Sequence, residues 1–189
     1  MTAAKKKIVV GITGASGAPY ARRLLGVLRA REDVEVGVCA SQTASEVWAL
    51  ECGGEMVHAI GSPVWGVRDY NAPFASGSAG WDAMAVVPCS MGTAARIAHG
   101  ISDTLLTRAA DVMMKERRTL VVVPRETPLS VVHLENLTIL ARAGVVVLPA
   151  MPSFYGKPRG LDEAIDTVVG RILDHLGVEH ALLRRWGTR

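Results

Sequence analysis

The sequence predicts an α/β fold with three layers (α/β/α), in which helices cover both faces of a mainly parallel, doubly wound sheet. Short apolar runs rich in valine and isoleucine alternate along the chain with segments of helical period. The runs are apolar at nearly every position, which is typical of strands buried on both faces of a parallel sheet. The alternation and the burial pattern together favour a sheet of the Rossmann or flavodoxin type.

The same patterns place the individual elements. The predicted strands are residues 7–13, 35–40, 83–88, 119–124 and 144–149. Pro19 suits the first turn of a helix over 20–30, and Gly144 and Gly177 suit the ends of two later helices. Further helices are predicted over 41–51, 91–100, 102–117, 130–144 and 161–177.

Residues 53–82 break this rhythm, being rich in glycine, proline, serine and aromatic residues. A loop of this length within a compact domain is usually functional. With 189 residues, 49% of them hydrophobic, the chain is predicted to form one domain over 1–189. Trp48, Trp65 and Phe74 lie in or near predicted loops and are expected to be exposed, which indicates a homo-oligomer.

Composition excludes several classes of partner. The 21 basic and 18 acidic residues are interspersed, so no nucleic-acid partner is expected. No apolar stretch approaches the roughly 18 to 20 residues of a membrane span, so no membrane partner is expected either. Three cysteines without a CxxC pair, and no recognisable secretory signal, predict free thiols and a cytoplasmic location. The histidines lack zinc-like spacing beside cysteines, so no metal site is predicted.

Small polar residues gather where the predicted strands end. This edge of an open parallel sheet is where ligands bind. Backbone amides, hydroxyl groups and helix N-termini at this edge are suited to holding a phosphate. The residues at the exits of the first four strands are Ala15, Ser16, Gly17, Ser41, Ser90, Met91, Gly92, Thr93 and Arg125.

The first of these turns differs from the dinucleotide fingerprint. Gly11, Gly14 and Gly17 form GxxGxxG and not GxGxxG, and Ser41 stands near the end of the second strand where an acidic residue would hold a ribose. A nicotinamide cofactor is therefore disfavoured and a mononucleotide is preferred. The alternative is that these glycines only make a tight turn.

Several separated motifs give the sequence a resemblance to a known family. They are GITGASGAPYARRLL (11–25), ASGS (75–78), PCSMGT (88–93), LLTRAADVMMKERRTLVVVPRETPLS (105–130) and PAMPSFYGKP (149–158). In this order, over nearly the whole chain, they resemble the UbiX-like flavin prenyltransferases. Several motifs in register are far more specific than one glycine loop.

This resemblance implies an activity. Such enzymes transfer a dimethylallyl group from dimethylallyl monophosphate to N5 and then C6 of reduced FMN, without a metal. The product, prenylated FMN, supplies a UbiD-type decarboxylase in ubiquinone synthesis or in the decarboxylation of aromatic acids. The resemblance also implies a dodecamer with active sites at subunit interfaces.

Roles for individual residues come from the same resemblance, by matching position. It implies FMN ligands at Ala15, Ser16, Gly17, Ser41, Ser90, Met91, Gly92, Thr93 and Arg125. It implies an allylic phosphate pocket made of Ser76, Arg108, Lys115, Glu126, Tyr155 and Arg171. It implies catalytic roles for Ser16, Glu51, Glu126 and Lys115. Cations would neutralise the departing phosphate, and Glu126, when protonated, could donate a proton to it.

Simpler interpretations stand beside these roles. Lys115 at a helix end would complement the helix dipole, and Glu51 would be a solvated carboxylate. Tyr155 would be a packing aromatic, Arg171 would lie on the polar face of a helix, and Cys89 would be a buried thiol.

Two other functions compete with the transferase. An FMN-dependent cysteine decarboxylase of the related fold would carry a PASANT-like segment and a histidine base, whereas this chain has FASGS at 74–78. A non-catalytic flavin carrier would bind FMN without consuming a prenyl phosphate.

Overall fold

The computed structural model describes residues 4–56, 63–183, 185 and 187 of the chain. In this part of the chain the strands form one sheet in the order β3-β2-β1-β4-β5-β6, and every neighbouring pair is parallel. This order is that of a doubly wound sheet. The strands are β1 (Lys6–Ile12), β2 (Val34–Ala40), β3 (Val64–Trp65), β4 (Ala83–Cys89), β5 (Thr119–Pro124) and β6 (Val146–Val147).

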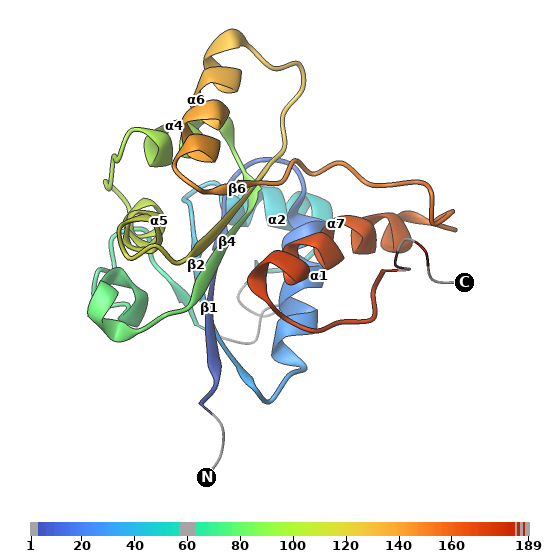
Figure 1. The fold of residues 1–189 in the computed structure, drawn as a ribbon, viewed down its shortest axis with the longest axis horizontal. Coiled ribbons are helices and arrows are strands. Elements are labelled where there is room, and N and C mark those ends of the chain that lie inside the picture. Colours follow the sequence, from blue (N-terminus) through green and yellow to red (C-terminus); the bar gives the residue numbers. More distant parts are fainter. Residues whose placement is uncertain (1–3, 57–62, 184, 186, 188–189) are drawn as a thin grey trace.

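Helices cover both faces of the sheet, which confirms the predicted three-layer α/β fold (Figure 1). Ile8, Val10 and Ile12 of β1 face a core completed by α1, α2 and α7, whereas Val9 faces a core completed by α4, α5 and α6. The helices are α1 (Ala18–Arg29), α2 (Ala44–Cys52), α4 (Met91–Ala98), α5 (Leu105–Lys115), α6 (Val131–Arg142) and α7 (Leu161–Leu176).

Side-chain caps fix where several helices begin. Thr104 accepts a hydrogen bond from the amide of Thr107 at the start of α5, and Thr107 bonds back to the amide of Thr104. Ser130 and His133 exchange bonds in the same way at the start of α6. Such reciprocal bonds satisfy two amides that the helix leaves unpaired. Gly177, with a φ of 65°, ends α7 as predicted.

The two edge strands differ from the prediction. The short strand β3 lies inside the predicted loop 53–82, and its residues 64–65 pair only with Val38 and Cys39 of β2. At the other edge, β6 covers two residues of the predicted strand 144–149. Edge strands are buried less completely than central ones, so their apolar runs are weaker signals.

The prediction that Trp48, Trp65 and Phe74 are exposed is wrong. Trp48 and Phe74 are fully buried, and the ring of Trp65 packs edge-on against Phe74 with 6.3 Å between centroids. Phe74 covers Gly37, where a β-carbon would lie only 2.8 Å from the rings of Phe74 and Trp81. The residues that do expose large apolar side chains include Leu50, Val131, Val132, Met151, Phe154 and Leu161.

Candidate active site

Four strand exits are joined at the carboxyl edge of the sheet. The amide of Ser41, after β2, bonds to the carbonyl of Ile12 at 2.8 Å. The amide of Thr13, after β1, bonds to Pro88 of β4 at 3.3 Å, and the amide of Arg125, after β5, bonds to Cys89 at 3.3 Å. The segments that carry the predicted cofactor residues therefore lie side by side.

Glu51 lies at the start of α1, although it comes from the last turn of α2. Its Oε2 accepts hydrogen bonds of 2.8 Å from the amides of both Gly17 and Ala18. Helix α1 has no acidic residue in its first turn and no side-chain cap of its own. Glu51 therefore supplies the negative charge that the positive end of a helix favours.

These contacts determine the protonation of Glu51. Burial raises its pKa, but the bonds from Ser16, Gly17 and Ala18, together with the positive charge of Arg125, outweigh burial and hold the pKa below its usual 4.5. Glu51 is therefore ionised at neutral pH and can accept a proton.

The glycine turn packs directly on the start of α2. A β-carbon on Gly14 would lie 2.0 Å from the Oγ1 atom of Thr43, so only glycine allows this approach. The hydroxyls of Thr43 and Ser41 are 3.5 Å apart. Thr43 was missing from the predicted site, because its closeness to Gly14 depends on the fold and not on a motif.

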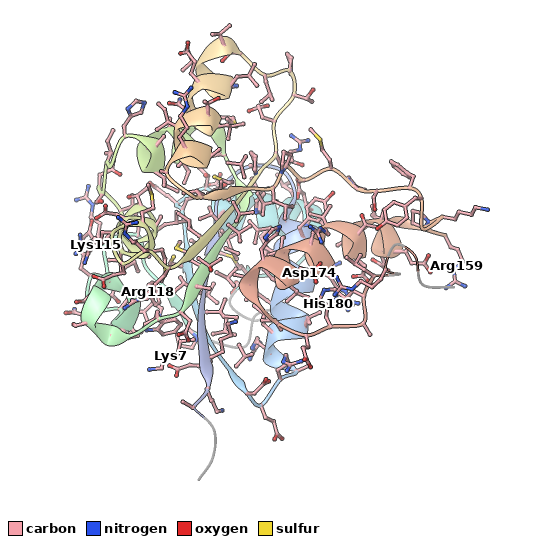
Figure 2. All side chains as sticks on the ribbon, in the orientation of Figure 1. Lys7, Lys115, Arg118, Arg159, Asp174 and His180 are labelled. Carbon is pink, nitrogen blue, oxygen red and sulfur yellow. The ribbon has the colours of Figure 1, made fainter. Side chains whose placement is uncertain are left out.

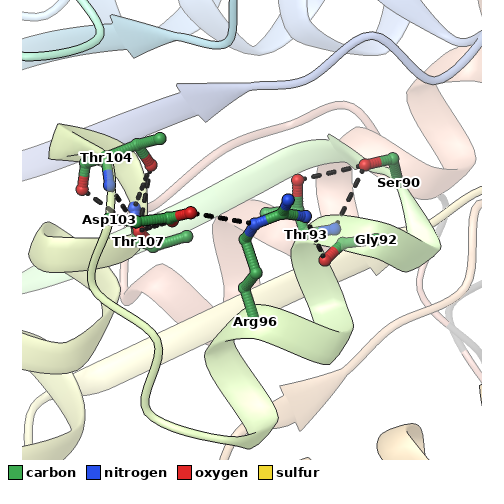
Figure 3. Close-up of polar contacts among 7 residues, drawn as sticks. All are labelled: Ser90, Gly92, Thr93, Arg96, Asp103, Thr104 and Thr107. Atoms are coloured by element: carbon green, nitrogen blue, oxygen red, sulfur yellow. Dashed lines mark hydrogen bonds and ion pairs between the residues drawn. The ribbon is translucent and has the colours of Figure 1, made fainter.

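Ser90 and Thr93 form the start of α4, as Figure 3 shows. Ser90 caps the helix by accepting from the amide of Thr93 at 3.3 Å, and the two hydroxyls are 3.0 Å apart. Met91 is buried in the core. The carbonyl of Gly92 accepts a hydrogen bond of 3.1 Å from Arg96, whose guanidinium also bonds to Asp103 at 3.3 Å. Arg96 thus connects this turn to the segment that begins α5.

Arg125 and Glu126 lie at the exit of β5 and line a cavity of about 290 Å³. The positive charge of Arg125 also reaches Tyr20 of α1, whose pKa is raised by burial and partly lowered again by that charge. The carboxylate of Glu126 accepts a hydrogen bond of 3.0 Å from the amide of Thr127. The walls of the cavity are otherwise largely apolar and include Leu129, Leu137, Pro149, Ala150 and Met151.

The residues predicted to bind the allylic phosphate do not form one pocket within a single chain. Arg108 donates to the carbonyl of Ala75 at 3.1 Å and pairs with Asp111 at 3.1 Å, which places it near the exposed Ser76 on the α5 side. Lys115 ends α5 and pairs with Glu116. Because β5 separates Lys115 from Glu126, about 20 Å of strand lies between them, at about 3.3 Å per residue.

The other two predicted phosphate ligands lie on the opposite side of the sheet. Tyr155 lies between β6 and α7 and lines a separate cavity of about 160 Å³. Arg171, on α7, donates to Asp174 at 2.9 Å. Asp174 also accepts from His180 and Arg185, so one carboxylate gathers three basic side chains. Figure 2 shows Lys115 beside α5 and Asp174 on the α7 side.

Among the described residues, Cys39 and Cys89 are buried thiols, and no group of side chains is suited to hold a metal ion. Burial raises the pKa of the Cys39 and Cys89 thiols to about 12, so both stay protonated at neutral pH. Cys89 therefore fits the interpretation as a structural thiol. No group of three or more His, Cys, Asp or Glu side chains within the described ranges could hold a metal ion. Over the same ranges, no helix is both long and apolar enough to cross a bilayer.

Comparison with known proteins decides the family. The Flavoprotein family model matches residues 1–175. A curated flavin prenyltransferase UbiX from Thermoplasma acidophilum is 48% identical over 182 residues, which are 95% of this chain and 99% of that protein. This chain belongs to the UbiX-like flavin prenyltransferases. The resemblance inferred from the motifs is confirmed.

Solved structures of UbiX-like proteins have the same fold. AnUbiX (PadA1), solved in complex with FMN and dimethylallyl pyrophosphate, superposes with a TM-score of 0.93 at 41% identity, over 98% of this chain and 99% of that chain. A dodecameric FMN-dependent UbiX-like decarboxylase from Escherichia coli O157:H7 gives 0.92 at 43% identity, over 96% and 100%. The cysteine decarboxylase SpaF gives only 0.61 at 17% identity, a likeness of fold alone.

Proposed function

We propose that this protein is a flavin prenyltransferase that moves a dimethylallyl group from dimethylallyl monophosphate to N5 and C6 of reduced FMN. The observation that carries the proposal is the 48% identity to a flavin prenyltransferase over 95% of the chain. Prenylated FMN is the product, and a UbiD-type decarboxylase is its recipient. The reaction class is a metal-independent group transfer.

The carboxyl edge of the sheet has the groups that FMN requires. The hydroxyls of Ser90 and Thr93 at the start of α4, the hydroxyl of Ser41 and the guanidinium of Arg125 would hold the cofactor, with backbone amides from Met91 and Gly92. Ala15, Ser16 and Gly17 would line the cofactor as the turn beside it, since the amides of Ala15 and Gly17 already donate to Thr13 and Glu51. Hydroxyl groups, amides and a cation suit a phosphate and a polar ring. When bound, reduced FMN supplies the nucleophile for the allylic carbon.

The protein's own groups then have separate tasks. Ser16 and the ionised Glu51, which act on each other electrostatically, would take up a proton released after alkylation. Arg108, Lys115 and Arg171 would neutralise the negative charge that builds up on the departing phosphate. Glu126, when protonated, and the hydroxyl of Tyr155 would each donate a hydrogen bond to the same phosphate.

The distribution of these groups supports active sites between subunits. Lys115 and Glu126 are separated by the length of β5, and Tyr155 and Arg171 belong to the other face of the sheet. Because one chain leaves them apart, neighbouring copies would bring them together. The E. coli protein is a dodecamer. We therefore propose a dodecamer for this chain as well, with its exposed apolar residues on α6 and before α7 at the contacts.

A cytoplasmic location completes the proposal. Cys39, Cys52 and Cys89 are all free thiols, as expected of a protein kept in a reducing compartment.

The test is an anaerobic incubation with reduced FMN and dimethylallyl monophosphate, followed by mass spectrometry of the extracted flavin. A flavin heavier by one prenyl unit, formed only with enzyme and also in the presence of EDTA, would support the proposal. A parallel reaction with dimethylallyl pyrophosphate identifies the preferred donor. Unchanged FMN that nevertheless stays bound would favour the carrier, and turnover of phosphopantothenoylcysteine would favour the cysteine decarboxylase.

A further inference from the structure

Thr13 is a buried polar residue at the exit of β1. Its exposed fraction is 1%, and Thr107 and Asn136 are the other buried polar residues of the described ranges. The Oγ1 atom of Thr13 donates to the carbonyl of Pro88 at 2.7 Å. The same atom accepts from the amide of Ser90 at 2.9 Å and from the amide of Ala15 at 3.4 Å.

These partners belong to two different loops. Ala15 lies in the glycine turn before α1, and Ser90 caps α4 after the neighbouring strand. A hydroxyl group has one donor and two acceptor positions, and Thr13 uses all three. The amide of Thr13 adds a bond of 3.3 Å to the carbonyl of Pro88. One residue therefore fixes the position of each loop relative to the other.

We propose that Thr13 is a positioning residue that sets the spacing of the two cofactor loops, 14–17 and 90–93, before FMN binds. The inference rests on the proposed function, because it assumes that both loops hold the flavin. Thr13 itself lies beneath the loops and would not contact the cofactor. Its hydroxyl acts on FMN affinity by holding the amides of Ala15 and Ser90.

Other hydroxyl groups nearby are not placed to replace it. The hydroxyl of Ser90 is 3.0 Å from that of Thr93 and accepts from the Thr93 amide. The hydroxyls of Ser41 and Thr43 lie 3.5 Å from each other, and that of Thr43 lies against Gly14. Removing the Thr13 hydroxyl would leave the partly buried amides of Ala15 and Ser90 without this partner, which is costly, whereas the carbonyl of Pro88 would keep the bond from the Thr13 amide.

Three variants test the inference. Thr13→Val keeps the shape of the side chain and removes the hydroxyl, whereas Thr13→Ser restores the hydroxyl. Thr107→Val is the matched control, since Thr107 is 3% exposed and also hydrogen-bonded, but lies at the start of α5. FMN dissociation constants are measured by fluorescence quenching at a temperature where circular dichroism shows each variant fully folded.

We expect Thr13→Val to raise the FMN dissociation constant by about tenfold, the loss expected for a buried bond left unmade. Thr13→Ser should stay within about twofold of the wild type, and Thr107→Val should lower the melting temperature without changing FMN affinity. A dissociation constant for Thr13→Val within about twofold of the wild type would overturn the inference. So would a Thr13→Ser protein as weak as Thr13→Val.

Hydrogen exchange in the wild-type protein without FMN gives a second test, which also serves if Thr13→Val does not fold. The amides of Ala15 and Ser90 should be protected, because both donate to Thr13. Exchange of the Ser90 amide at the rate of an open loop would contradict the inference. Failure of the wild type to bind FMN would instead overturn the proposed function and, with it, the cofactor role of Thr13, while protected amides would still show the two loops joined.

Discussion

The carboxylate of Glu51 accepts a hydrogen bond of 2.8 Å from the amide of Gly17, which joins the last turn of α2 to the first turn of α1. The glycine turn that looks built for a phosphate thus presents the amides of Gly17 and Ala18 to a side chain of the protein itself. The positive end of α1 is already compensated. An incoming anion would therefore meet two amides that already donate to Glu51.

Replacing Glu51 by glutamine should separate its charge from its geometry. Glutamine can still accept the bonds from Gly17 and Ala18, but it cannot take a proton from Ser16. We expect prenylated flavin to form at least about tenfold more slowly, within the usual range for a lost acid or base, while FMN still binds. Glu46→Gln, an exposed change on the same helix, is the control. Equal rates for Glu51→Gln and wild type would refute the assigned role.

The pH dependence of folding stability follows from the same contacts of Glu51. The pKa of Glu51 is lower in the folded protein than its usual 4.5, so the ionised form is favoured by folding. The contribution of the Glu51 charge to folding stability is complete above pH 4.5. It is lost as the pH falls through the lower pKa that Glu51 has in the folded protein. The wild-type protein should therefore be more stable than Glu51→Gln above pH 4.5 and should lose this advantage as the pH falls through the folded pKa of Glu51. Urea unfolding at several pH values measures the difference.

A methyl group on Gly14 should disturb the turn, because its β-carbon would lie 2.0 Å from Oγ1 of Thr43. We expect Gly14→Ala to lower the free energy of unfolding by about 1 to 3 kcal/mol, the range for overpacking, and to weaken FMN binding. Adding Thr43→Gly removes the clash and should restore part of the free energy of unfolding and part of the FMN affinity. Gly26→Ala is the control, since nothing lies within 4 Å of a β-carbon there, and it should stabilise α1 by about 0.5 to 1 kcal/mol.

Asp174 should stabilise the C-terminal segment against α7. Burial raises the pKa of Asp174, but hydrogen bonds from Arg185 and His180 outweigh burial and hold the pKa below its usual 3.8. Asp174→Asn should lower the free energy of unfolding by about 1 to 2 kcal/mol at pH 7. This difference should vanish as the pH falls through the folded pKa, below 3.8. A difference that persists at pH 2 would indicate packing rather than charge. Glu135→Gln, exposed on α6, controls for loss of a carboxylate.

Subunit sharing predicts complementation between two inactive variants. Lys115→Ala and Glu126→Gln should each retain FMN and lose most prenyl transfer. If a site takes its lysine and its glutamate from different chains, oligomers co-expressed from the two variants should recover about one quarter of wild-type activity. Random assembly gives a site an intact lysine in about half of the cases and an intact glutamate in about half, so about one quarter of sites have both. Activity no higher than that of the separate variants would show that one chain supplies both residues.

Tyr155→Phe and Arg171→Ala should act mainly on binding of the prenyl phosphate. Each would remove a proposed phosphate contact and leave the cofactor edge untouched, so the KM for dimethylallyl monophosphate should rise with little change in FMN affinity. Arg159→Ala, whose side chain is 88% exposed before α7, is a control for loss of a cation. An unchanged KM in both variants would remove these residues from the pocket.

The sequence by itself determined the layers, the central strands and the family. Strands such as β4 are buried on both faces, so their apolar runs can be read without knowing their neighbours. Helix ends such as Gly177 are also local signals and could be predicted from the sequence. The motifs that match the family are also contiguous in sequence.

Only the tertiary structure decided which of these segments meet. Glu51 and Gly17 are 34 residues apart in sequence, and Thr13 lies 77 residues from Ser90, so no local pattern links either pair. The burial of Trp48 and Phe74 likewise depends on how helices and loops pack on the sheet. Local propensity and burial pattern depend on residues that are close in sequence, whereas contacts between distant residues are set by the folded topology.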